Sequence, residues 1–295
     1  MHAGVHEFRA MGSPCSFHVF HENEEKLNKA IALAQQEVIR LEKKYSRFLN
    51  DSVLSDINNQ AGIQSVQVDS ETAGLLNYAA LCFEQSDALF DITSGVFRRV
   101  WDFKSTRLPE QSAVNEVLQY VGYEKINWNG NSIFLPTHME IDLGGVVKEY
   151  AADCARQVFL ENEIHHGLVN LGGDIAVLGE KPDLSPWYVG VRNPQQPQQA
   201  IVDIPLTQGA IATSGYYERY MLVDGERYCH IINPMTGWPV RYCATVSVVS
   251  PSCLVSGSLA TIAMLKQNEA VTWLEEQGAV FFLQNHEAQH FGSFC

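Results

Sequence analysis

Two pairs of glycines, each preceded by apolar residues, are the features of this sequence best suited to bind a ligand. The first pair lies within residues 142–150 (DLGGVVKEY) and the second within residues 170–174 (NLGGD). A glycine pair lets the backbone approach a ligand closely and present free N–H groups to an anion, above all where a helix begins. The sequence therefore predicts one anion-binding site built from both loops. The alternative is two tight turns with a purely structural role.

Two hydroxyl groups and a histidine further along the chain add candidate chemistry. Thr213 and Ser214 end an expected strand, where their hydroxyls are suited to contact phosphate oxygens or a ribityl chain. His230 leaves another expected strand just before the rigid turn that begins with Asn233. A histidine held in this way can act as a general base near neutral pH. Each feature also has a structural alternative, either an ordinary strand end or a packing role for the imidazole.

The spacing of apolar residues predicts the elements that must position these groups. Strands are expected before each glycine pair, at residues 139–141 and 167–169, and Asp224-Gly225 predicts a hairpin turn. Helices are expected over residues 24–45, 52–58, 70–87, 112–121, 149–160, 252–265 and 269–277, with Ser70 as the cap of the third. Further strands are expected at residues 6–20, 125–128, 132–135, 187–191, 201–206, 210–213, 219–223, 227–232, 244–250 and 279–283.

This mixture of elements favours an α+β fold with mixed sheets flanked by helices over a doubly wound parallel sheet. We expect a single domain over residues 1–295. The polar segment at residues 104–112 is the best candidate for a weak subdivision.

The composition argues against several classes of protein. A net charge of −14 disfavours nonspecific binding to nucleic acid or to an anionic membrane, since both need a basic surface. Seven cysteines are scattered without a CxxC pair, which indicates neither a disulfide framework nor a zinc site. No apolar run reaches the roughly 18 residues of a membrane span. The N-terminus has no signal peptide or lipobox pattern, so we expect a cytoplasmic protein, or a periplasmic one if a leader has been removed.

The order and spacing of the motifs resemble the ApbE-type flavin transferases, the family of FAD:protein FMN transferases. The resemblance runs nearly from end to end, and the motifs are specific as a set although each is short. The matching segments are Met11-Gly12-Ser13, Tyr45-Ser46-Arg47-Phe48, Ser52-Val53-Leu54-Ser55, Asn58, Phe90-Asp91-Ile92-Thr93, Trp101-Asp102-Phe103, residues 142–145 and 170–174, Ala212-Thr213-Ser214-Gly215, His230-Ile231-Ile232 and Leu259-Ala260-Thr261.

The resemblance implies an ApbE-like fold and a Mg²⁺-dependent reaction. FAD is split at its diphosphate, FMN is attached through a phosphoester to a Thr or Ser of a target protein, and AMP is released. His230 matches the family histidine expected to act as the base, and the Val147 carbonyl and Thr261 match oxygen ligands of the metal. The positions that match the surroundings of FAD are Met11, Tyr45, Asp142, Gly144, Gly145, Lys148, Asn170, Gly172, Gly173, Asp174, Thr213 and Ser214.

The chain departs from the family pattern at the metal. The last helix of the family usually begins Glu-Ala-Asp-Ala-Leu-(Ala/Ser)-Thr, whose Asp helps to hold Mg²⁺, and here residues 255–261 are VSGSLAT, with Gly257 at the Asp position. Mg²⁺ usually takes at least one carboxylate ligand. Glu149, which stands where the family has Gly, either supplies that carboxylate or points to solvent from the first turn of its helix. Two further family acids are replaced, by Tyr216 and Asn233.

Three activities therefore stay open. They are FMN transfer, FAD binding with weak or no transfer, and an FAD pyrophosphatase that hands FMN to water.

Overall fold

An antiparallel sheet of eight strands runs through the structure, a computed structural model that describes residues 1–196, 198–217 and 219–294. Every strand pair in this sheet is antiparallel, so the sheet is not mixed in strand direction. In spatial order the strands are β1 (His2–Ala10), β2 (Ser13–His21), β6 (His166–Leu171), β7 (Asp174–Gly179), β10 (Gly209–Gly215), β13 (Cys243–Ser250), β14 (Val280–Asn285) and β15 (His290–Gly292).

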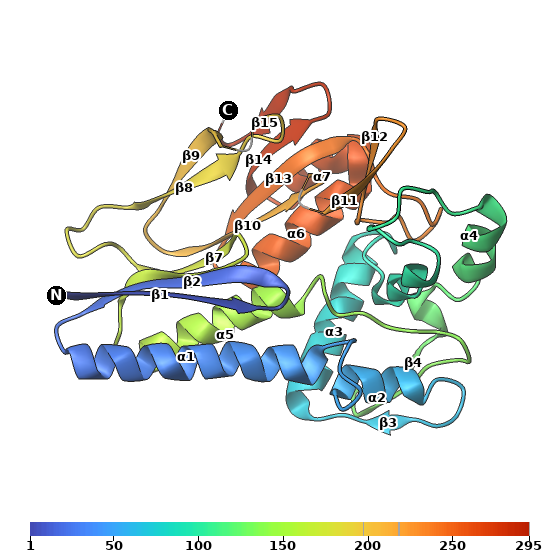
Figure 1. Cartoon of the computed structure of the whole chain (residues 1–295), viewed down its shortest axis with the longest axis horizontal. Coiled ribbons are helices and arrows are strands. Elements are labelled where there is room, and N and C mark those ends of the chain that lie inside the picture. Colours follow the sequence, from blue (N-terminus) through green and yellow to red (C-terminus); the bar gives the residue numbers. More distant parts are fainter. Residues whose placement is uncertain (197, 218, 295) are drawn as a thin grey trace.

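Helices cover one face of this sheet (Figure 1). The helices α1 (Glu24–Tyr45) and α5 (Val147–Glu161) pack together below β1 and β2, and α6 (Cys253–Lys266) lies across β10 and β13. α1 is amphipathic, with its apolar residues spaced three and four apart on the buried side. Its first turn is capped by Asn23, whose side chain accepts the Lys26 N–H at 2.9 Å. The short helix α7 (Ala270–Glu276) packs against α6.

A two-stranded sheet of β8 (Trp187–Arg192) and β9 (Ala200–Leu206) contributes to a second apolar cluster, which covers the opposite face of the main sheet. Successive residues of the main sheet alternate between the two buried layers. Leu168, Val177 and Ile211 pack with the β8–β9 hairpin, whereas Val169 and Ala176 pack with the helices. Both faces of the central strands are therefore buried, which explains why they are apolar throughout rather than alternating with polar residues.

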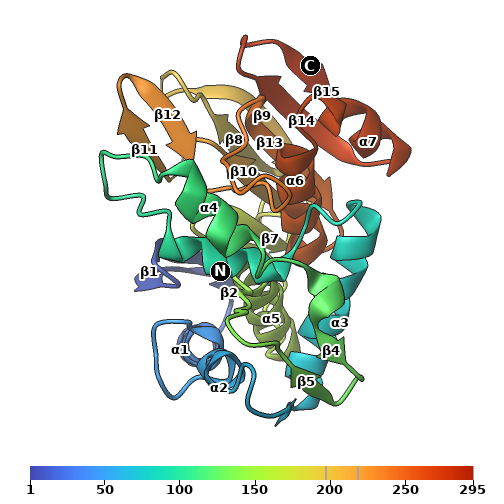
Figure 2. The ribbon, with the colours of Figure 1, turned by 90° about the vertical axis from the view of Figure 1, so that its right-hand side faces the viewer.

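The remaining elements gather at one end of the molecule, on the right in Figure 1 and facing the viewer in Figure 2. They are the helices α2 (Val53–Asn59), α3 (Ser70–Gln85) and α4 (Gln111–Leu118), the short strands β3 (Val66–Gln67), β4 (Asn127–Trp128) and β5 (Ser132–Phe134), and the 3₁₀ turns Ile92–Arg99 and Tyr123–Lys125. The hairpin of β11 (Tyr220–Val223) and β12 (Glu226–Cys229) lies above them, and the 3₁₀ turn Gln267–Glu269 joins α6 to α7. None of the described helices combines the length and apolar character needed to cross a lipid bilayer.

Most predicted elements are confirmed, and the differences have local causes. The α1 bounds match, and Asp224-Gly225 forms the hairpin turn, with positive φ at both residues. The single strand predicted over residues 6–20 is wrong, because Met11 and Gly12, with φ of 52° and 73°, turn the chain into a hairpin. The cap of α3 is Asp69 rather than Ser70, and its side chain accepts the Thr72 N–H at 2.8 Å.

Candidate active site

Two turns and a strand end meet at one end of the eight-stranded sheet. Because β2 pairs with β6, the turn between β1 and β2 lies beside the turn between β6 and β7, and the Gly172 N–H donates to the Pro14 carbonyl at 3.0 Å. Because β10 runs antiparallel to β7, with Ile211 opposite Ile175, the last residues of β10 reach the same end. The predicted site residues collected here are Met11, Asn170, Gly172, Gly173, Asp174, Thr213 and Ser214.

Most of the glycine N–H groups at this end already have acceptors within the protein. Gly173 donates to the side chain of Asn170 at 2.8 Å, and Gly144 donates to that of Asp142 at 2.9 Å. Together with the bond of Gly172 across to β2, these contacts make the prediction of free N–H groups wrong for three of the four glycines. For Gly144 and Gly173 the reason is the Asp or Asn two or three residues earlier, whose side chain competes for the same N–H, and for Gly172 it is the backbone of the neighbouring strand β2.

The first glycine loop is held by side chains from the segment that follows α1. Residues 139–141 belong to no strand of the described chain, so the strand predicted there is wrong. Instead, the Asn58 side-chain amide accepts the Ile141 N–H at 2.8 Å and donates to the Ile141 carbonyl at 2.9 Å. Arg47 forms an ion pair with Asp142, and its guanidinium carbon lies 5.0 Å from the ring centre of Phe48, which is 80% exposed.

Arg47 and Asn58 were not predicted as site residues. The available signal was that Arg47 is the only basic residue between positions 45 and 58, in a segment already matched to the family.

Two carboxylates and one ammonium group lie together where α5 begins. Lys148 forms an ion pair with Asp174, which is 2% exposed. Glu149 is 7% exposed and close to both charges. Burial raises the pKa of Glu149 to about 7, and the Asp174 carboxylate adds to this rise while Lys148 opposes it. Burial alone would lower the pKa of Lys148, but the two carboxylates outweigh it and the pKa is raised.

Glu149 fills the space beside Gly257 of α6. A Cβ atom built on Gly257 would lie 2.4 Å from Cγ and 3.0 Å from Cδ of Glu149. The alternative in which Glu149 points to solvent is therefore wrong. α5 begins at Val147, two residues earlier than predicted, and Glu149 lies on its buried side, facing α6.

Hydroxyl pairs link the end of β10 to its neighbours. The Ser214 Oγ lies 3.0 Å from the Thr261 Oγ1 of α6, and the Thr213 Oγ1 lies 2.7 Å from the Ser247 Oγ of β13. Successive side chains of a strand point to opposite faces, so only Ser214 faces the helices and the buried charges. The structure thus joins Ser214 to Thr261 and separates Thr213 from them.

His230 directly follows β12 and is oriented by the backbone. Its Nδ1 lies 3.0 Å from the carbonyl of Arg219, an arrangement in which Nδ1–H donates and Nε2 is left as the basic nitrogen. The ring is exposed, yet the surrounding protein still lowers its pKa by removing hydration. The charges of Arg219 and Lys148 lower the pKa further, which places His230 within electrostatic reach of the buried charges. The following turn is fixed by Trp101, whose indole N–H donates to the Gly237 carbonyl at 2.8 Å.

Three predicted residues have positions that fit a structural role. Tyr45 is 6% exposed, and its hydroxyl lies 3.1 Å from the Thr72 Oγ1, so its place beside a flavin stays a prediction. Met11 occupies the β1–β2 turn and donates its N–H to Glu42 Oε1 at 2.5 Å. Val147 is the first residue of α5, where its carbonyl is expected to accept a helical hydrogen bond and to keep one lone pair for another partner.

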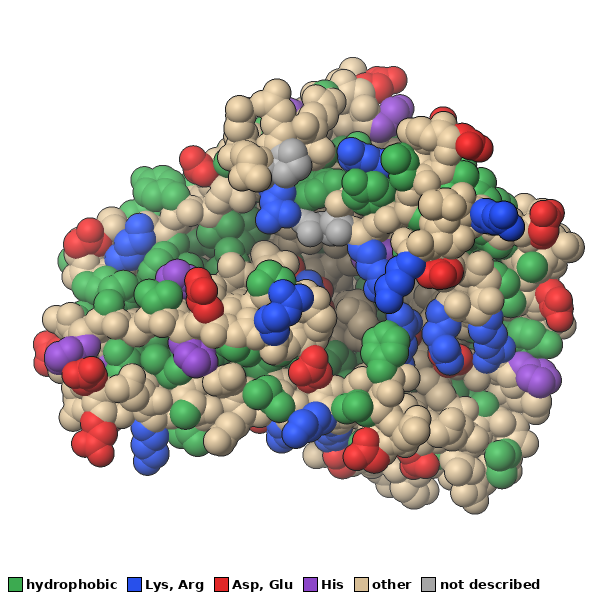
Figure 3. All heavy atoms as spheres, viewed as in Figure 1, with side chains coloured by type: hydrophobic (Ala, Val, Ile, Leu, Met, Phe, Trp, Pro, Cys, Tyr) green, Lys and Arg blue, Asp and Glu red, His purple; other side chains and the backbone are tan. Residues whose placement is uncertain are grey.

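One face of the molecule is hollowed and basic beside the β1–β2 hairpin. Figure 3 shows a hollow between the β1–β2 hairpin and the end that carries α4, with Lys and Arg side chains gathered around it. This local charge is opposite in sign to the net charge of −14 and favours an anionic ligand. Among the described residues, no three His, Cys, Asp or Glu side chains are grouped to hold a metal.

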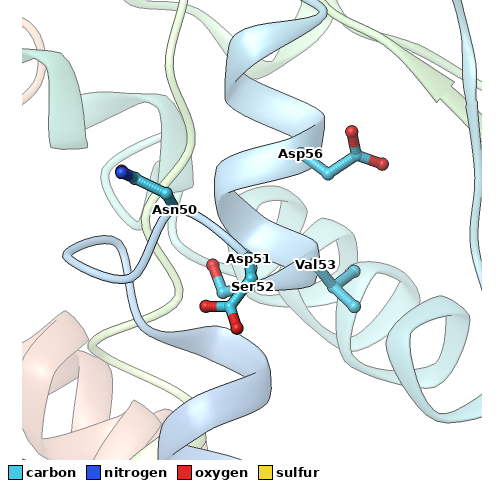
Figure 4. A pocket seen from close by; sticks show the side chains of 5 residues that line it. All are labelled: Asn50, Asp51, Ser52, Val53 and Asp56. Carbon is cyan, nitrogen blue, oxygen red and sulfur yellow. The ribbon is translucent and has the colours of Figure 1, made fainter.

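A second hollow lies at the start of α2 (Figure 4), and none of the predicted site residues lines it. Asp51 and Asp56 contribute two carboxylates to its lining, which would repel a phosphate. The other lining residues are Asn50, Ser52 and Val53. We therefore locate the candidate site at the basic hollow.

Comparison with known proteins agrees with this arrangement. The ApbE family model matches residues 11–282. An FAD:protein FMN transferase of Treponema pallidum (strain Nichols) is 31% identical over 255 residues, covering 80% of this chain and 69% of that protein. Another, from Klebsiella pneumoniae (strain 342), is 28% identical over 293 residues, covering 94% and 88%. The crystal structure of the ApbE protein from Thermotoga maritima MSB8 matches with a TM-score of 0.92 at 28% identity, covering 99% of this chain and 97% of that one, and confirms the predicted fold. The chain therefore belongs to the ApbE family.

Proposed function

We propose that this chain is an FAD:protein FMN transferase. A Thr or Ser hydroxyl of a target protein attacks the phosphorus of the FMN half of FAD. A phosphoester to FMN forms, the bond to the AMP half breaks, and AMP leaves. The relatives that carry this name match most of the chain. The observation that carries the proposal is the oriented imidazole of His230, whose Nδ1 lies 3.0 Å from the Arg219 carbonyl and whose pKa is lowered by burial and further by the charges of Arg219 and Lys148.

His230 supplies the base for this reaction. Its lowered pKa keeps the imidazole neutral at pH 7, and the bond from Nδ1–H to the Arg219 carbonyl leaves Nε2 to accept the proton of the attacking hydroxyl. No hydrogen bond engages Nε2 within the part of the chain that is described. A base that is oriented, neutral and accessible meets the requirements for activating a hydroxyl.

Lys148 supplies fixed positive charge for the diphosphate. Its raised pKa keeps the ammonium charged, and the ion pair with Asp174 fixes its place at the start of α5. Phosphoryl transfer depends mainly on positioning and on stabilising charge in the transition state. The Ser214 hydroxyl, paired with Thr261, is a further donor on the same side of the sheet.

A divalent cation, Mg²⁺ by preference, fits the donor set beside Lys148. The fit rests on the buried carboxylate oxygen Glu149 Oε2, which has no hydrogen-bond partner among the described residues, and on the neighbouring Asp174 carboxylate, whose Oδ2 is paired with Lys148. Mg²⁺ selects hard oxygen ligands of this kind. The residues that would hold it are Glu149, Thr261 and the Val147 carbonyl. When bound, the cation supplies charge neutralisation to the diphosphate.

The test is an incubation of the purified chain with FAD, Mg²⁺ and a protein that the Klebsiella pneumoniae relative modifies. The Klebsiella pneumoniae relative, incubated in the same way, serves as the positive control. Covalent flavin on the acceptor, seen by in-gel fluorescence and by mass, is the expected result, and the His230→Ala variant should lose it. Release of AMP and FMN without modified acceptor would replace the proposal with an FAD pyrophosphatase. FAD that binds but stays intact would show a flavin-binding protein without transfer activity.

A further inference from the structure

We propose that Glu149 and Gly257 form one functional unit, in which a glutamate on α5 occupies the volume left by a glycine on α6 and supplies the carboxylate for the divalent cation. This inference rests on the proposed function only for the role of the cation. The placement of the carboxylate itself is carried by the packing of the two helices.

The packing shows that the two positions depend on each other. Any side chain at position 257 would begin 2.4 Å from the Glu149 Cγ, well inside van der Waals contact. Glu149 in its present conformation and a larger residue at position 257 therefore exclude each other. The carboxyl oxygen Oε1 of Glu149 lies 3.1 Å from the same built Cβ, so the carboxylate itself, and not only its stem, occupies the place beside α6.

The charges around Glu149 favour a role in binding a cation over a role in packing alone. Glu149 and Asp174 are both more than nine-tenths buried, and Glu149 Oε2 has no hydrogen-bond partner in the described chain. Lys148 is the ammonium that pairs with Asp174 there, so two carboxylates face one positive charge. Buried carboxylates are normally paired, hydrogen-bonded or bound to a metal. A divalent cation satisfies the unpartnered Glu149 oxygen and balances the second carboxylate charge, and Thr261 lies one helical turn beyond Gly257 on α6.

The competing interpretation makes Glu149 an uncharged filler of the space beside Gly257. Glutamine has nearly the same shape as glutamate but is a weaker ligand for a hard cation. A Glu149→Gln variant therefore keeps the packing and removes the charge. Its matched control is Glu161→Gln, an exposed glutamate on the same helix.

The experiment measures Mn²⁺ binding to the metal-free full chain, with and without FAD, from the electron paramagnetic resonance signal of free Mn²⁺. Loss of an outer-shell partner already weakens metal binding about 10- to 100-fold, so loss of a ligand should weaken it at least tenfold in Glu149→Gln. The Glu161→Gln control should bind as the wild type does. Equal Mn²⁺ affinity of Glu149→Gln and wild type would overturn the inference and leave Glu149 as a filler.

The exchange of positions gives a second, independent test. Gly257→Asp alone should lower the melting temperature, because its side chain collides with Glu149. The double variant Glu149→Ala/Gly257→Asp removes the collision and returns a carboxylate to the same place, so it should recover both the melting temperature and most of the Mn²⁺ affinity. A stable double variant that still binds Mn²⁺ as weakly as Glu149→Gln would contradict the inference.

The inference and the proposed function can fail separately. If Mn²⁺ affinity follows Glu149 but wild type modifies no acceptor, the cation site stands and the transferase proposal fails. If wild type modifies the acceptor while Mn²⁺ affinity is indifferent to Glu149, the transferase proposal stands and the carboxylate lies elsewhere.

Discussion

The Lys148 ammonium on the first turn of α5 is paired with the Asp174 carboxylate on the first residue of β7. This contact joins the helix that follows one glycine pair to the strand that follows the other. It therefore fixes the relative position of the two loops, and it does so with a charge that also faces Glu149 and lies within electrostatic reach of His230.

Removing this ammonium should destabilise the fold. Lys148→Met leaves two neighbouring carboxylates without a countercharge, whereas Asp174→Asn leaves Lys148 with Glu149. We expect the free energy of unfolding to fall by about 2–4 kcal/mol in Lys148→Met, below the full value for a broken buried pair because the ammonium is 27% exposed. Asp174→Asn should lose clearly less. Urea unfolding at pH 8 measures both, and an equal loss in the two variants would contradict this account of the charges.

The pH dependence of transfer should follow His230. Its pKa lies below the ordinary value of 6.5, so the neutral, basic form predominates from there upward. The rate should therefore rise with pH in the acid range and level off by about neutral pH, and His230→Ala should lose about 10²–10⁴-fold in rate. FAD affinity, measured by flavin fluorescence, should change little. A wild-type rate that still climbs steeply between pH 7 and 8 would exclude His230 as the base.

Glu71 should stabilise the contact between α1 and α3. Arg40 and Lys44 of α1 donate to its carboxylate, at distances of 2.6 to 2.9 Å. The hydrogen bonds from Arg40 in particular hold its pKa down at about 2. A lowered carboxylate pKa stabilises the fold above the unfolded value near 4.5, and this stability is lost as the pH falls toward 2.

The Glu71→Gln variant tests this contribution. It should lose about 1–2 kcal/mol of unfolding free energy at pH 7 and much less at pH 3, with the partial exposure of the network keeping the loss small. Glu84→Gln, an exposed glutamate on the same helix, is the control. The same loss at both pH values would show that packing rather than charge is responsible.

A substitution at Tyr45 tests whether its side chain has a structural role or contacts the flavin. Its buried hydroxyl pairs with Thr72, so Tyr45→Phe should cost about 1 kcal/mol of stability. If the side chain serves only the core, FAD affinity stays within a factor of two of wild type. A tenfold loss of FAD affinity without a matching loss of stability would instead support the family-based prediction that Tyr45 borders the flavin.

The elements that the sequence predicted best depend on local signals. The helix α1 has its apolar stripe, its Asn23 cap and a change of pattern after Tyr45 within one short window, so its bounds follow from the sequence. The hairpin turn at Asp224-Gly225 is equally local. By contrast, the turn at Met11 and Gly12 was missed, because the alternation on its two sides was assigned to a single strand.

The site depended on contacts that no local pattern carries. The absence of an acid at position 257 and the gain of Glu149 are both visible in the sequence, but their contact joins two helices about 100 residues apart and appears only in the fold. Likewise, the Lys148–Asp174 ion pair links the elements that follow the two glycine pairs, and the capture of glycine N–H groups by Asn170 and Asp142 depends on loop geometry. The ion pair of Arg47 with Asp142 is non-local in the same way.

The most direct test of the central claim compares AMP release with covalent flavin on an acceptor protein. The purified chain is mixed with FAD, Mg²⁺ and either the acceptor or an acceptor whose modified Thr is changed to Val. The account predicts that AMP and protein-bound flavin appear in equal amounts with the first acceptor and that neither appears with the second. AMP release that is the same with both acceptors, or with none, would contradict it.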